Sequence, residues 1–191
     1  MRRWLAFALA VLAGEVLAQP NSVLLVARPA LRDPNFVQTV VLVTHTPEGG
    51  AIGVILNRPG ERRLPNWPEP LYAGGPVMQQ IVVALFASDS PPQEAAFSML
   101  PQVYLSMHPK NLEALLAQPS PSTRLFSGFS GWAPRQLEAE IDGGSWYVMR
   151  ATPALVFRKD TAGMWDELVA LARGARTSRD PPTFVAAILV P

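Results

Sequence analysis

The stretch TVVLVTHTPEGGAIGVIL, residues 39–56, decides the fold. Its two ends, 39–44 and 51–56, are apolar and partly β-branched, and the turn-forming residues 47–50 separate them. This pattern predicts a β-hairpin. Both predicted strands are apolar almost without alternation, which indicates that each face of the sheet is buried. The hairpin therefore belongs in the interior, with other elements packed on both of its faces.

Further elements extend outward from this hairpin in an irregular mixture of strands and helices. The predicted strands are 22–27, 81–86, 124–129 and 145–149, and the predicted helices are 111–118, 134–141 and 162–173, the last capped by Thr161 and stopped by Gly174. Residues 60–70 form a proline-rich connector, and residues 184–190 fit a last strand or a short helix equally well. The order favours one mixed α/β domain, α+β-like in character, rather than a doubly wound dinucleotide-binding fold.

The first eighteen residues have the pattern of a cleavable signal peptide. Arg2 and Arg3 precede the apolar run 4–13, and Val16 and Ala18 supply a cleavage site for signal peptidase. The apolar run is too short to span a bilayer, which needs about 20 residues, and no other stretch is as long. A buried N-terminal core helix is the alternative. We therefore expect residues 1–18 to be removed and 19–191 to form a single domain in the bacterial periplasm or outside the cell, with no transmembrane segment after cleavage.

Charge and cysteine content exclude several function classes. The chain has 16 basic and 15 acidic side chains, and removing the signal peptide leaves fourteen of each. A nucleic-acid binder would be expected to show a basic excess, so the neutral domain argues against such a partner. Cysteine is absent, which excludes thiol nucleophiles and thiolate metal sites.

Candidate catalytic groups are few. The motif GFSGW, residues 128–132, partly matches the nucleophile elbow G-x-S-x-G and would place Ser130 between a strand and a helix. Both histidines, His45 and His108, precede Ser130, so the chain order differs from that of α/β-hydrolases. Two distant histidines without clustered carboxylates predict no metal site. We therefore assign no catalytic residue, metal or cofactor, and a hydrolase of unknown substrate that uses Ser130 or a carboxylate is the alternative.

Several short motifs follow one another along the chain: LVARP (25–29) with DPNF (33–36), GAIGVILNRP (50–59), YAGGPV (72–77), and GFSGW with QLEAE (136–140) and Trp146. Together they resemble the YqgE/AlgH family over most of residues 22–174. The resemblance implies a bifurcated β-sheet curled into a pseudo-barrel with flanking helices, and no established enzymatic activity. The family is usually cytoplasmic, so the signal peptide sets this chain apart.

From the resemblance and the lack of a catalytic constellation we expect a non-enzymatic binding or accessory protein. Its partner is an unknown protein or small molecule. The candidate surface consists of motif residues: Asp33, Asn57, Arg58, Gly74, Gly75, Trp132, Gln136 and Glu138. Some family members are labelled transcriptional regulators, which gives a third alternative, although an exported protein does not meet the chromosome.

Overall fold

The computed structural model describes residues 22–177. The predicted signal peptide, 1–18, and the undecided segment 184–190 lie outside the described residues. The strands are β1 (Val23–Ala27), β2 (Val40–His45), β3 (Ala51–Ile55), β4 (Tyr72–Ala73), β5 (Val77–Ala87), β6 (Phe97–Leu100), β7 (Val103–Ser106), β8 (Thr123–Trp132) and β9 (Trp146–Arg150). The helices are α1 (Pro109–Ala117), α2 (Gln136–Asp142), α3 (Pro153–Val156) and α4 (Met164–Thr177).

The predicted hairpin is present and buried on both faces. β2 and β3 pair antiparallel, with Val43 opposite Gly53. Alternate residues of β2 enter different cores, since Leu42 belongs to the larger cluster and Val41 to the second. The same division along β1 places Leu24 in the larger core and Leu25 in the second. The nearly continuous apolar runs are thus explained by a sheet with packed side chains on either side.

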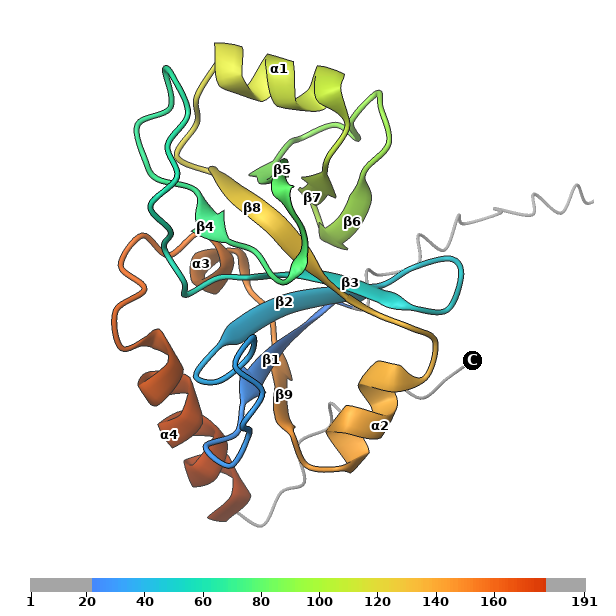
Figure 1. The fold of residues 1–191 in the computed structure, drawn as a ribbon, viewed down its shortest axis with the longest axis vertical. Coiled ribbons are helices and arrows are strands. Elements are labelled where there is room, and N and C mark those ends of the chain that lie inside the picture. Colours follow the sequence, from blue (N-terminus) through green and yellow to red (C-terminus); the bar gives the residue numbers. More distant parts are fainter. Residues whose placement is uncertain (1–21, 178–191) are drawn as a thin grey trace, which may run out of the picture.

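Strand β8 is the branch point of the sheet. Its residues 130–132 pair with β3, whereas residues 126–127 pair in parallel with β4 and residues 123–127 pair antiparallel with β5. The strand order is β6-β7-β5-β8-β3-β2-β1-β9, with β4 attached to β8 (Figure 1). The branching agrees with the expected bifurcation. The sheet is not closed, since β6 lies against β2 without pairing to it.

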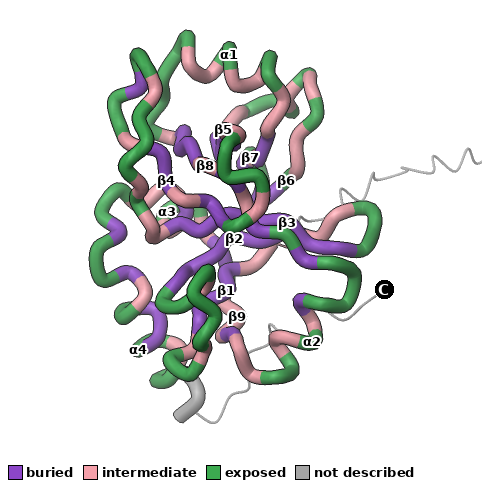
Figure 2. Tube along the Cα trace, viewed as in Figure 1, coloured by how far each residue is buried: buried purple, intermediate pink, exposed green. Residues whose placement is uncertain are grey.

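Helices cover the sheet from different sides. On one face α4 packs along β1 and β9, and the indole of Trp165 donates to the carbonyl of Ala27 at 2.7 Å. Helix α1 lies at the other end of the molecule, where Leu112, Leu115 and Leu116 pack over a third core cluster (Figure 1). Figure 2 shows the resulting distribution, with buried strands at the centre and exposed loops and helix faces outside. No helix within residues 22–177 is long and apolar enough to cross a membrane.

The differences from the predicted elements have local causes. β6 and β7 had no predicted counterpart, because each is four residues long and their turn at Gln102 (φ +62°) lacks a glycine signal. The predicted strand 81–86 begins earlier, at Val77, since the exposed glutamines 79–80 interrupt its apolar pattern.

Two predictions about α4 are wrong. Gly174 does not stop the helix, which continues to Thr177. At the other end, Thr161 does not cap the helix with its side chain as predicted. Its backbone carbonyl, rather than its hydroxyl, accepts from the Met164 amide at 3.2 Å.

Candidate functional site

Ser130 lies inside β8, not at the strand-to-helix turn that a nucleophile elbow requires. Its side chain is completely buried, and its hydroxyl donates to the carbonyl of Gly74 at 3.1 Å. A nucleophile must instead reach a substrate carbonyl at the surface of a cleft. The placement of Ser130 therefore gives it a structural role, joining β8 to the segment after β4.

Asn57 and Arg58 hold the segment 33–38 against the sheet. The Asn57 side chain accepts from the Val40 amide at 2.8 Å and donates to the Gln38 carbonyl at 2.9 Å. The Arg58 guanidinium donates to the carbonyls of Asn35 and Val37, at 2.9 and 3.1 Å.

Asp33 starts the same segment. Its carboxylate accepts from the Asn35 amide at 2.8 Å, closing an Asx turn. The polar side chains of Asp33, Asn57 and Arg58 are thus engaged with backbone, and their common effect is to order one loop.

Gly74 and Gly75 are required because this segment passes very close to β8. A Cβ added to Gly74 would lie 2.2 Å from the Gly128 carbonyl oxygen, and one added to Gly75 would lie 2.3 Å from the Ser130 hydroxyl. Gly75 also has φ +152°, which disfavours other residues. The Gly74 amide donates to the Ser127 carbonyl. Its backbone is therefore used in the sheet rather than offered to an anion.

Trp132 and Gln136 both donate hydrogen bonds to the carboxylate of Glu140. Glu140 was not among the predicted site residues. One oxygen of Glu140 accepts from the indoles of Trp132 and Trp146, at 3.1 and 3.0 Å. The other accepts from the Gln136 amide at 3.0 Å. Phe36 stacks on Trp132 with ring centroids 5.6 Å apart. We call Phe36, Trp132, Trp146 and Glu140 the indole–carboxylate cluster.

A sequence signal for this cluster was present in the four-residue spacing of Gln136 and Glu140, which places both on one helix face. Glu138, the acid singled out instead, lies 3.9 Å from His45 with both side chains about one-third exposed. That pair is weak in water. The indole–carboxylate cluster therefore contains the helix acid with the stronger contacts.

An open groove with several polar groups in its wall remains beside Gly75. A recess of about 50 Å³ adjoins a larger one of about 270 Å³, and the two share Ala73, Gly75 and Gln79. Together they form what we call the β4–β5 groove, whose other lining residues are Asn35, Ile55, Arg58, Gly60, Glu61, Arg62, Leu71, Pro76 and Ser127. Of the predicted site residues, only Arg58 and Gly75 line it.

Arg62 is the polar group of the groove that sequence reasoning missed. The residue is exposed, and one of its terminal nitrogens donates to the Gln80 carbonyl at 3.0 Å and the Ser127 hydroxyl at 3.2 Å. The Ser127 hydroxyl in turn donates to the Gln79 carbonyl at 2.6 Å. These bonds fix the guanidinium at the groove wall. Residues 60–70 gave no such signal because the sequence shows only a polar connector there.

Arg124 is the second residue without a sequence signal. It is buried, donates to the carbonyls of Leu56 and Arg158, and stacks 4.6 Å above the Tyr72 ring. Desolvation lowers the pKa of its guanidinium, and the nearby Tyr72 and Glu69 oppose that shift. The buried guanidinium links β8 to the residues that follow β3 and α3. It is not accessible to a ligand. Elsewhere in the described chain, no group of three or more potential metal-ligating side chains occurs.

Comparisons with known proteins agree on one family. Its sequence profile, described as AlgH-like (DUF179), matches residues 24–176. A UPF0301 protein of Thermobifida fusca is 38% identical over 165 residues, covering 76% of this chain and 83% of the relative. A UPF0301 protein of Myxococcus xanthus is 36% identical, covering 75% and 85%.

Solved structures show the same fold. The solution structure of the AlgH protein from Pseudomonas aeruginosa matches with a TM-score of 0.66 and 25% identity, covering 88% of this chain and 99% of that one. A crystal structure of a Corynebacterium diphtheriae protein matches with a TM-score of 0.65 and 26% identity, covering 88% and 91%.

Proposed function

The chain belongs to the AlgH-like family, and from this premise we propose that it is a non-enzymatic binding or accessory protein of the bacterial periplasm. The β4–β5 groove is its proposed binding site. The observation that carries the proposal is the contrast between two polar groups. The Ser130 hydroxyl is buried and bonded to backbone, whereas the Arg62 guanidinium is exposed at an open groove.

The groove presents hydrogen-bonding groups in a fixed arrangement. Arg62, Ser127 and the Gln79 backbone form one chain of hydrogen bonds along its wall. Among the described residues no carboxylate forms a salt bridge with Arg62. A guanidinium placed in this way recognises oxygen acceptors such as carboxylate or backbone carbonyl groups. This supports binding of a polar small molecule or an extended peptide.

The test begins with protein purified under native conditions from its own bacterium and measured by native mass spectrometry. We expect a retained molecule of defined mass, which is then identified and titrated against variants. Arg62→Ala should weaken its binding by about tenfold, the usual effect of losing a charged hydrogen-bond partner. Arg63→Ala is the matched control, because Arg63 donates to the Pro68 carbonyl and does not line the groove.

Two results would contradict the proposal. Equal weakening by Arg62→Ala and Arg63→Ala would place the ligand outside the groove. Hydrolysis of ester or peptide substrates by the wild-type protein, retained after Arg62→Ala, would favour the enzymatic alternative. The hydrolase alternative loses its serine nucleophile, because Ser130 is buried.

A further inference from the structure

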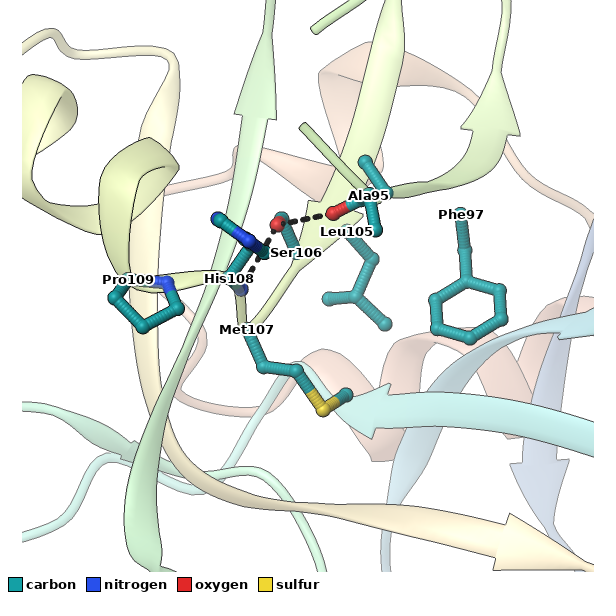
Figure 3. Close-up of a pocket in the computed structure, with 8 residues that line it drawn as sticks. Ala95, Phe97, Leu105, Ser106, Met107, His108 and Pro109 are labelled. Atoms are coloured by element: carbon teal, nitrogen blue, oxygen red, sulfur yellow. Dashed lines mark hydrogen bonds between the residues drawn. The ribbon is translucent and has the colours of Figure 1, made fainter. Parts of the chain in front are cut away.

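A recess near the β6 edge of the sheet has a mainly apolar lining. Its volume is about 400 Å³, and residues 95–97 and 105–109 form its wall (Figure 3). Its Ser106 hydroxyl donates to a backbone carbonyl at 2.7 Å, and its His108 lies 3.5 Å from the carboxylate of Glu94. Both polar side chains of this apolar recess therefore already have a partner within the protein.

The arginines of the β4–β5 groove, in contrast, are engaged only in part. A guanidinium has five N–H donors. Arg58 uses two of them for carbonyls of the loop before β2, and Arg62 uses two for the Gln80 carbonyl and the Ser127 hydroxyl. Within residues 22–177 neither guanidinium forms a salt bridge. Each therefore retains N–H donors and an uncompensated positive charge for a ligand.

The two arginines line different parts of the groove. Arg58 lines the part of about 50 Å³ and Arg62 the part of about 270 Å³, whereas Ala73, Gly75 and Gln79 line both. One water occupies roughly 30 Å³ in the liquid, so the smaller part has room for a group of the size of a carboxylate. A ligand that extends through both parts therefore meets one guanidinium in each.

One acidic side chain, Glu61, also lines the larger part of the groove. Among the lining residues, two arginines and one glutamate leave a net charge of +1. Glu61 is exposed, so water screens its charge and its repulsion of an anion in the groove is modest. The charge of the wall thus favours an anionic ligand over a neutral one.

We propose that the β4–β5 groove binds a small dicarboxylate, with one carboxylate toward Arg58 and the other toward Arg62. The inference rests on the proposed function, since it names the ligand class of the same site. Guanidinium and carboxylate groups form short, charge-assisted hydrogen bonds, often two at a time. Ala73 and Gly75, which both parts of the groove share, contact the carbon atoms between the two carboxylates.

The test is a chemical-shift titration of the whole nitrogen-15-labelled protein at low salt with succinate, glutarate and adipate. These probes differ in the separation of their carboxylates. We expect at least one of them to bind saturably, about tenfold more tightly than the monocarboxylate of the same length, because it gains a second charged hydrogen-bond partner. Added NaCl should weaken this binding, since salt screens exposed charges.

Substitutions in the wall of the groove test each charge. Arg62→Gln should lower the affinity for the dicarboxylate about tenfold, to that of the monocarboxylate. Arg63→Gln is the matched control and should leave it unchanged, because Arg63 does not line the groove. Glu61→Gln removes the opposing charge and should raise the affinity for the dicarboxylate about two- to fivefold.

Three results would overturn the inference: none of the three dicarboxylates binds saturably, monocarboxylates bind as tightly as dicarboxylates, or Glu61→Gln leaves the affinity unchanged. A failure of this inference differs from a failure of the proposed function. If the native protein retains a neutral molecule whose binding is weakened by Arg62→Ala and not by Arg63→Ala, the dicarboxylate is wrong and the groove remains the binding site.

Discussion

Glu140 shows how one half-buried carboxylate organises its surroundings. It accepts from two indole N–H groups and from the Gln136 amide, and the two tryptophans are 5% and 2% exposed. Buried indole nitrogens have a donor and no acceptor function, so they need an oxygen nearby. Glu140 provides that oxygen for both rings and thereby joins the end of β8, the start of β9 and helix α2.

We predict that Glu140→Ala destabilises the protein by about 1–3 kcal/mol, because it leaves two buried donors without an acceptor. Urea unfolding followed by tryptophan fluorescence measures the loss. Glu138→Ala makes the same change two residues earlier in α2, where Glu138 makes one ionic contact within residues 22–177, the 3.9 Å approach to His45. Its cost should stay within about 0.5 kcal/mol. Similar losses in both variants would show that the helix, not the indole–carboxylate cluster, is responsible.

At the scale of elements, the segment after β4 passes very close to β8. Gly75 has no room for a side chain, since a Cβ would lie 2.4 Å from the Phe129 carbonyl oxygen. Gly131, in the same strand β8, would bring its Cβ only to ordinary contact distances of 3.6 Å and more. The two glycines therefore have different physical reasons for their presence.

Gly75→Ala should destabilise the protein by about 2–4 kcal/mol, because backbone must move to accommodate the methyl group. The measurement is the free energy of unfolding in urea. Gly131→Ala is the control and should change stability by less than about 1 kcal/mol, the range of a glycine effect without a clash. If Gly75→Ala leaves the free energy of unfolding unchanged, the segment after β4 can move away from β8 without loss of stability.

In helix α4, in contrast to β8, replacing a glycine by alanine is expected to stabilise the protein. Gly174 lies within the helix, and a Cβ there would meet nothing within 4 Å. Gly174→Ala should therefore raise stability by about 0.5–1 kcal/mol through lower unfolded-state entropy. A higher midpoint of thermal unfolding checks this. A decrease would indicate that the chain needs the conformational freedom of glycine at this position.

At the scale of the whole molecule, the branched sheet leaves two separate recesses at its surface. The β4–β5 groove adjoins β8 beside the branch, whereas the apolar recess lined by residues 95–97 and 105–109 lies near the β6 edge. The two share no lining residue, so a substitution in the wall of one leaves the wall of the other unchanged.

The predicted export of the whole chain is tested by cell fractionation with mass measurement. We expect the native protein in the periplasmic fraction with Gln19 as its first residue, because signal peptidase requires the small Ala18 before the cleaved bond. Ala18→Tyr should accumulate the uncleaved precursor, while Ala6→Leu, within the apolar run, should be processed normally. A cytoplasmic protein that starts at Met1 or Arg2 would contradict the predicted signal peptide and remove the periplasm from the proposed function.

The sequence by itself determined the central hairpin, its burial on both faces and the mixed α+β character. These features depend on local apolar runs and turn residues, as at 39–56, which bias the backbone wherever they occur. It also identified residues that matter, such as Asn57, Arg58 and Gly75, but not what they do. The hydrogen-bond partners of Asn57 and Arg58 lie 17 to 23 residues away in the sequence. Gly75 is constrained by the backbone of the neighbouring strand β8.

Only the tertiary structure decided which polar groups face solvent and which are used internally. Ser130 and Arg62 both have polar side chains that could serve a site, yet the fold buries the first and leaves the second at a groove. The open sheet, the indole–carboxylate cluster and the apolar recess at residues 95–97 and 105–109 arise likewise from contacts between segments that are apart in the sequence. Burial depends on how the whole chain packs, so neither composition nor spacing in the sequence specifies it.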